Sequence, residues 1–180
     1  MEKVKVDIRY ATAADNVLLA ELGARTFYAT FAADNTPENM AAYLAASFSP
    51  EKQAAELAAP DSVFLIAEVD ATVAGYARLR EGQPSTRTTG VRPIEIVRLY
   101  ARQEWLGQGI GAALIKACLG EAARRGCDII WLDVWEHNLR ARAFYSQWGF
   151  VEAGTQSFQL GAEMQNDLLM QRRVYAQPAP

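Results

Sequence analysis

Residues 94–111 read IEIVRLYARQEWLGQGIG and decide the fold of this chain. The part from Ile94 to Ala101 has the apolar, β-branched composition of a strand. A turn follows, made of Leu106, Gly107, Gln108, Gly109, Ile110 and Gly111. Apolar residues then recur with helical spacing to about Ala123. Glycines at every second position leave main-chain N–H groups exposed beside the positive end of the helix dipole. Such a turn can hold a phosphate or a diphosphate.

The composition limits the class of protein. The chain has 180 residues, 51% of them hydrophobic, and a net charge of −3. This length predicts one domain over residues 1–175 and a loose tail at 176–180. The acidic balance argues against nucleic acid as a partner. No long apolar run or signal peptide is present, which predicts a cytoplasmic protein without a membrane partner. Cys118 and Cys127 lack metal-ligand or redox spacing, so we expect reduced thiols and no metal site.

The remaining pattern is that of an α/β protein. Thr36-Pro37 and Ser49-Pro50 are helix starts, and Thr12 with Asp15 resembles a capping box. Strands are expected at 4–10, 62–68, 73–79, 128–135, from 150 and at 167–174, and helices after 12, at 37–48, at 50–60, from 110 and at 138–149. Strand 128–135 follows the helix after the glycine turn, which predicts that it lies parallel to strand 94–101.

Two familiar phosphate-binding motifs do not fit the turn. A P-loop needs Lys and Ser or Thr after its last glycine, but Gly111 is followed by two alanines. The dinucleotide fingerprint lacks its third glycine, because Leu114 stands there. An ordinary tight loop between strand and helix therefore stays an alternative. A Ser-His-Asp triad would depend on His137, the single histidine, and no Gly-x-Ser-x-Gly motif supports it.

A second motif lies on the predicted helix after Asn138. Asn138, Ala141 and Tyr145 are spaced i, i+3 and i+7, so an amide, a small side chain and a phenol share one helix face. Phe144 and Trp148 lie beside them as core residues. The alternative is that Tyr145 is a half-buried aromatic whose hydroxyl is bonded to a carbonyl.

Together these motifs resemble the GNAT superfamily of N-acetyltransferases. That family has a strand, then Arg/Gln-x-x-Gly-x-Gly/Ala opening a helix, then Asn-x-x-Ala-x-x-Phe/Leu-Tyr and a Gly-Phe pair. The matching residues are Gly109, Gly111, Asn138, Ala141, Phe144, Tyr145, Gly149 and Phe150. The resemblance extends over Val6 to Val174. Leu106 departs from it, because the family has Arg or Gln there. Stretches at 31–40, 130–136, 157–158 and 167–168 are also similar to Pai-type spermidine/spermine acetyltransferases.

The resemblance implies a mixed central sheet flanked by helices on both faces. It also implies transfer of an acetyl group from acetyl-CoA to an amine in a ternary complex, without a metal. Cofactor contacts would come from Leu99, Tyr100, Ala101, the turn from Leu106 to Gly111, Asn138 and Ala141. Tyr145 would protonate the leaving sulfur, which suits a phenol with a pKa of about 10 facing a thiolate.

The general base and the acceptor site are less defined by the sequence. Glu95 could accept the proton of the amine through water, or it could be an ion-paired strand carboxylate, with Arg98 as a candidate partner. Asp133 and Glu136 could attract a cationic acceptor, or they could be a strand polar position and a cap.

The segment between the first two helices shapes the acceptor site in this family. We expect Tyr28, Phe31, Asp34 and Glu38 to lie there, where carboxylates and rings would suit a polyamine. A solvated helix start is the alternative for each. A protein N-terminus or an amino-sugar drug is the second choice of acceptor. A silent acetyl-CoA-binding regulator is the rival to an enzyme, and a homodimer is an alternative to a monomer.

Overall fold

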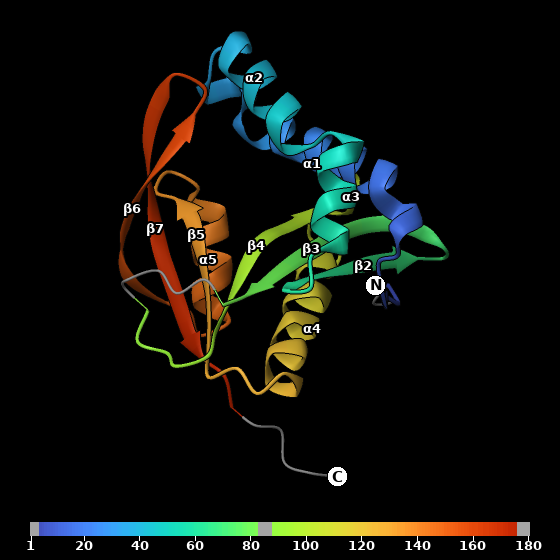
Figure 1. Cartoon of the computed structure of the whole chain (residues 1–180), viewed down its shortest axis with the longest axis vertical. Coiled ribbons are helices and arrows are strands. Elements are labelled where there is room, and N and C mark those ends of the chain that lie inside the picture. The colour runs from blue at the N-terminus through green and yellow to red at the C-terminus, as the bar shows by residue number, and fades with distance from the viewer. Residues whose placement is uncertain (1–3, 83–87, 176–180) are drawn as a thin grey trace.

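The computed structural model describes residues 4–82 and 88–175 (Figure 1). The strands are β1 (Asp7–Tyr10), β2 (Ser62–Val69), β3 (Thr72–Glu81), β4 (Pro93–Ala101), β5 (Ile129–Trp135), β6 (Val151–Leu160) and β7 (Glu163–Arg173). They form one sheet in the order β1-β2-β3-β4-β5-β7-β6. β4 and β5 are parallel, as predicted, and the other neighbours are antiparallel. The predicted tail at 176–180 lies outside the described residues.

Five α-helices accompany the sheet in the described residues, and local capping explains the starts of two of them. They are α1 (Asn16–Phe31), α2 (Pro37–Ser47), α3 (Pro50–Ala58), α4 (Ile110–Arg124) and α5 (Leu139–Gln147). The Thr36 and Ser49 hydroxyls accept hydrogen bonds from main-chain N–H groups in the first turns of α2 and α3, and a proline follows each. The Thr12–Asp15 capping box is present and opens a short 3-10 turn ahead of α1.

Helices cover both faces of the sheet, which confirms the expected α/β architecture. On one face, Leu114 and Ile115 of α4 pack with Ile130 and Leu132 of β5 in the main core. On the other face, α1 packs against β2 and β3. Both cysteines are buried free thiols. Burial raises the pKa of Cys118 to about 12, so it remains protonated at neutral pH. No helix in the described ranges is long and apolar enough to cross a bilayer.

Two predicted strand starts are wrong by three residues or more. β1 begins at Asp7 rather than Val4; in its register β2 ends at Val69, opposite Val6, so residues 4 and 5 lie beyond the end of the partner strand. β7 begins at Glu163 rather than Asp167, since a tight hairpin pairs its first residues with the end of β6. The segment from Glu163 to Asn166 is mostly polar, so its strand character is not visible in the sequence.

The expected position of Tyr28 and Phe31 between two helices is also wrong. Both lie inside α1, which ends at Phe31. The rings of Phe27 and Phe31, one helical turn apart, are 4.4 Å apart between centroids, and this contact favours continuation of the helix. Asp34 alone of the predicted residues lies in the α1–α2 connection, in a 3-10 turn, and Glu38 is in the first turn of α2.

The hairpin between β6 and β7 is fastened to the start of α2. The Asn39 side-chain oxygen accepts a hydrogen bond from the Ala162 N–H at 3.0 Å. Gln165 donates to the Asn35 side-chain oxygen at 2.7 Å. At the hairpin tip, Gly161 has a φ of +62°, and a Cβ there would collide with Asn39. The tip therefore needs glycine both for its backbone conformation and for its contact with α2.

We expect Gly161→Ala to detach this hairpin and to lower the free energy of unfolding by about 1–3 kcal/mol, because strain and overpacking act together. Thermal unfolding of the two purified proteins measures the effect. Gly120→Ala is the matched control: Gly120 lies inside α4 with open space around it, so alanine should stabilise the helix by up to about 1 kcal/mol. Equal melting temperatures for Gly161→Ala and the wild type would contradict the proposed role of the hairpin contact.

Candidate functional site

The two parallel strands in the middle of the sheet separate soon after they meet. β4 pairs with β5 only from Pro93 to Glu95, although β4 continues to Ala101 and β5 to Trp135. Figure 1 shows the upper parts of the two strands diverging. Residues 96–101 therefore have a strand neighbour, β3, on one side only. Their other edge offers main-chain N–H and C=O groups to a ligand, as an open sheet edge offers them to a strand.

A β-bulge in β4 sets which side chains border this opening. Arg78 of β3 is opposite Arg98, but the next residue, Leu79, is opposite Ile96, so Val97 is the extra residue. Beyond the bulge, Leu99 and Ala101 pack on the α4 side. Tyr100 points to the α1 side, where its ring contacts Tyr76. The predicted cofactor residues Leu99, Tyr100 and Ala101 thus lie on the unpaired part of β4.

The glycine turn has the open backbone that the sequence predicts. Gly107 and Gly109 have φ values of +79° and +93°, and a Cβ on either would meet no atom within 4 Å. Five main-chain N–H groups have no hydrogen-bond acceptor among the described residues: those of Gly107, Gly109, Ile110, Gly111 and Ala112. They surround the N-terminus of α4, whose dipole favours an anion. The Gln108 main-chain N–H instead donates to the Trp105 carbonyl, and its side-chain amide donates to the Glu104 carbonyl. The Leu106 side chain is 40% exposed.

Gly75 of β3 allows the N-terminus of α4 to pack closely against the end of β4. Gly75 is opposite Ala101, and a Cβ on it would collide with the Tyr100 carbonyl and lie 3.0 Å from Ile110 Cγ2. The side chain of Ile110 is buried over this position. Because glycine leaves space there, the turn can lie directly beside the end of β4. This residue was not identified from the sequence, where a glycine inside a strand is a weak signal.

Tyr145 and Asn138 lie on α5, which packs beside α4. A Cβ on Gly111 would lie 3.4 Å from the Phe144 ring, so the two helices are in close contact. Tyr145 is buried, and burial, with a smaller effect of nearby Cys118, raises its pKa. Its hydroxyl has no hydrogen-bond partner within the described ranges. The alternative of a hydroxyl tied to a carbonyl is therefore not supported, and the phenol stays protonated at neutral pH.

Asn138 has a structural role at the start of α5. Its side-chain oxygen accepts a hydrogen bond from the Ala141 N–H at 3.1 Å and caps the helix. Its amide N–H groups make no bond in the part of the chain that the structure describes. A ligand could therefore use the amide group while the oxygen holds the helix, and Ala141 leaves space one turn later.

Glu95 is ion-paired, but not with Arg98. Its carboxylate accepts from Arg80 at 2.6 Å, whereas Arg98 binds Glu56 of α3 at 2.6 Å. The expected Arg98 partner is therefore wrong. Arg80 is directly opposite Glu95 in the antiparallel pair, and Arg98 lies beyond the bulge. Glu95 is buried at the last residue where β4 still pairs with β5, so it lies at the base of the opening.

The predicted acceptor residues are brought together only in part. The Phe31 ring contacts the Trp135 ring at 5.8 Å, which joins the end of α1 to the end of β5. Asp133 lies in β5 and Glu136 just after it. Tyr28 is 55% exposed and Asp34 is exposed, so neither forms a wall of a site in this conformation. Trp135 was not singled out from the sequence, although an aromatic residue at the end of a central strand is a usable signal.

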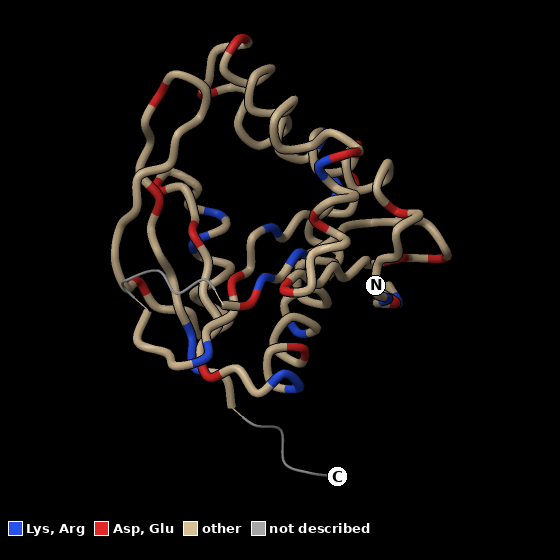
Figure 2. Tube along the Cα trace, viewed as in Figure 1, with Lys and Arg blue, Asp and Glu red and all other residues tan. Residues whose placement is uncertain are grey.

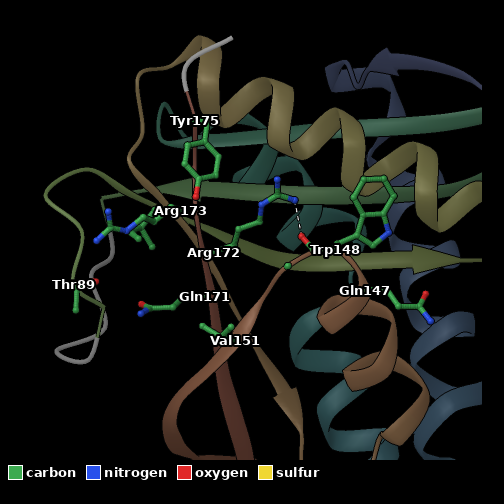
Figure 3. Close-up of a pocket in the computed structure, with 10 residues that line it drawn as sticks. Thr89, Gln147, Trp148, Val151, Gln171, Arg172, Arg173 and Tyr175 are labelled. Atoms are coloured by element: carbon green, nitrogen blue, oxygen red, sulfur yellow. Dashed lines mark hydrogen bonds between the residues drawn. The ribbon is translucent and has the colours of Figure 1, made fainter.

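A hollow of about 750 Å³ lies elsewhere on the molecule (Figure 3). It is bordered by the end of α5 and by β7, with Trp148, Arg172 and Tyr175 among its residues, and Arg172 donates a hydrogen bond to the Trp148 carbonyl. None of the residues predicted for the cofactor or the acceptor lines it. Size alone therefore does not identify the candidate site.

Comparison with known proteins agrees with this geometry. The profile of the Acetyltransferase (GNAT) family matches residues 24–150. An uncharacterized N-acetyltransferase of Mycobacterium tuberculosis is 35% identical over 156 residues, which are 87% of this chain and 96% of the relative. The chain therefore belongs to the GNAT family and is an acetyltransferase.

Solved structures share the fold. The PaiA N-acetyltransferase of Thermoplasma acidophilum, solved in complex with coenzyme A, superimposes with a TM-score of 0.76 at 22% identity, over 94% of this chain and 99% of that one. The ribosomal-protein-S18-alanine N-acetyltransferase of Escherichia coli gives 0.69 at 16% identity, over 97% of each chain.

We expect Gly109→Glu to raise the dissociation constant for acetyl-CoA at least about tenfold, because the carboxylate would occupy the N–H cradle and repel the diphosphate. Calorimetric titration measures the change. Gly82→Glu is the matched control, since Gly82 also has a positive φ and open space but lies at the end of β3. If both variants bind acetyl-CoA as the wild type does, the turn is not the diphosphate site.

Proposed function

We propose that this protein transfers the acetyl group of acetyl-CoA to a primary amine of a small cationic acceptor, with a polyamine as the leading candidate. The observation that carries this proposal is the charge of the elements on the acceptor side. Residues 26–51, 129–139 and 153–171 contain no Lys or Arg, whereas six Asp and Glu fall in the same ranges outside Glu51. In Figure 2, neither α2 nor the tip of the β6–β7 hairpin carries Lys or Arg. A field of one sign attracts a multiply charged cation.

The opposite side of the opening suits an anionic cofactor. The free N–H groups of the turn fit a diphosphate, and the unpaired edge of β4 fits the amide-bearing pantetheine arm. When bound, acetyl-CoA supplies the activated acetyl group. A main-chain N–H of Leu99, Tyr100 or Ala101 would stabilise negative charge on the acetyl oxygen, a contribution of about 3–4 kcal/mol in a dry site.

Two side chains are suited to move protons. Tyr145 is neutral, buried and free to donate, which supports its role as the acid toward the leaving sulfur. Glu95, at the base of the opening, is our candidate to receive the proton of the acceptor, whose free pKa is about 10.4. The ion pair with Arg80 holds this carboxylate in place at the base of the opening, where it would accept the proton through water.

The names of the structural neighbours bear on the acceptor. The likeness to PaiA supports a polyamine as the acceptor, and the likeness to the ribosomal-protein enzyme supports a protein N-terminus as the second candidate.

We expect spermidine and spermine to be acetylated with at least about tenfold higher kcat/KM than lysine-like monoamines, because the acidic side binds each extra cation. A free-thiol assay with a panel of amines, peptides and aminoglycosides measures this. A preference for an alanine peptide would indicate that the acceptor is a protein N-terminus and not a polyamine. Absence of turnover with every acceptor would indicate a regulator that binds acetyl-CoA without catalysis.

We expect Tyr145→Phe to lower kcat by about 10²-fold or more, because the leaving thiolate loses its proton donor. The dissociation constant for acetyl-CoA and the melting temperature should remain near those of the wild type, since only a hydroxyl is removed. Tyr175→Phe, at a residue that is 72% exposed, is the control and should leave kcat unchanged. Equal kcat values for Tyr145→Phe and the wild type would show that another group is the acid.

A further inference from the structure

Asp167 is a carboxylate that the proposed chemistry does not use. It lies in β7, directly opposite Trp135 of β5 and Gln156 of β6. Its Oδ1 atom is buried and has no hydrogen-bond partner, and no Lys, Arg or His is within ion-pair distance of it among the described residues. An unsatisfied buried carboxylate oxygen costs free energy. The site therefore lacks a donor, and the residue keeps some exposed surface through which one can reach it.

The surroundings of Asp167 are aromatic and acidic. Odd-numbered residues of β7 share the face of Leu169, which packs with Trp131 away from α4. Tyr43 of α2 lies near enough to sense the charge of Asp167, and its ring contacts Phe158 of β6 at 5.5 Å. Burial, together with the charge of Glu136, raises the pKa of Asp167 to about 6. Rings beside a carboxylate are a favourable environment for an organic cation.

The position of Asp167 in the sheet indicates how far it lies from the proposed acetyl site on β4. β5 lies between β4 and β7, so Asp167 is at least two strand spacings, roughly 10 Å, from the edge of β4 that would hold the acetyl group. Divergence of β4 from β5 adds to this separation. Asp167 is therefore too far away to contact the reacting nitrogen, but a chain of several methylene groups spans the interval.

We propose that Asp167 binds the second, non-reacting ammonium group of a diamine or polyamine and so selects such acceptors over monoamines. This inference rests on the proposed amine acetylation. The ammonium supplies the missing donor and the missing counter-charge in one group. Asp167 is then a specificity-determining residue. It takes no part in acetyl transfer, for which Tyr145 and Glu95 are the proposed proton-transfer residues.

The test compares n-butylamine with spermidine as acceptors for the wild type and Asp167→Asn. We expect the substitution to lower the kcat/KM preference for spermidine about 10-fold to 100-fold, mainly through KM, because a charged hydrogen bond is lost. The rate with n-butylamine and the affinity for acetyl-CoA should remain unchanged. Asp70→Asn is the matched control: Asp70 is exposed in the β2–β3 turn with a φ of +47°, a conformation that asparagine also adopts.

The pH dependence provides a second measurement. Because Asp167 loses its charge below a pH of about 6, the spermidine preference of the wild type should fall as the pH drops through this value. Asp167→Asn should show no such fall. Glu136, just after β5, and Tyr43 of α2 interact electrostatically with Asp167. The tyrosine is neutral throughout this range, and Glu136 is present in both proteins.

The outcomes separate the two proposals. Preference for spermidine that persists in Asp167→Asn overturns the inference, and so does an equal loss of rate with both amines. Calorimetric titration of spermidine into the protein with coenzyme A gives the same distinction without turnover, since the wild type should bind it at least tenfold more tightly than the variant. If neither amine is acetylated yet this difference in binding holds, the proposed function fails while the assignment of Asp167 stands.

Discussion

The parting of β4 from β5 is the constraint on which the site depends. A buried strand normally satisfies its main-chain groups on both edges, and an unpaired edge inside a protein is costly unless something else bonds to it. Here β4 leaves its neighbour after Glu95, and the bulge at Val97 turns the rest of the strand away. α4 begins beside this edge, so the same place offers strand N–H groups and helix N–H groups together, which a bound ligand could satisfy.

This arrangement places two opposite electrostatic environments at the opening between β4 and β5. The α4 side presents main-chain N–H groups at the glycine turn, and it needs no cationic side chain there. The side proposed for the acceptor is built from segments that contain carboxylates and no Lys or Arg. Under the proposed function, an anionic cofactor and a cationic acceptor would use different sides of the opening between β4 and β5 and would not compete for one site. The small net charge of −3 conceals this division, because it averages over both sides.

The parts of this structure that were predictable have local causes. Capping at Thr36 and Ser49, the hairpin turn after Val69 and the glycine turn all depend on residues a few positions apart. The parts that were missed depend on contacts between distant segments. Nothing near Gly75 in the sequence indicates that Ile110 will pack on it. The ion pair of Glu95 with Arg80 likewise follows from strand register, which the bulge shifts by one residue.

Leu106 shows why a departure from the family pattern need not remove the function. The family's Arg or Gln at this position would add a side-chain donor, and leucine cannot donate. However, the geometry of the glycine turn is set by the positive φ values of Gly107 and Gly109 and by the packing of Ile110 against Gly75. None of these features depends on the side chain at 106, which is 40% exposed. We therefore propose that main-chain groups at the start of α4 still bind the diphosphate, and that leucine at position 106 removes one contact from a site built mainly of backbone.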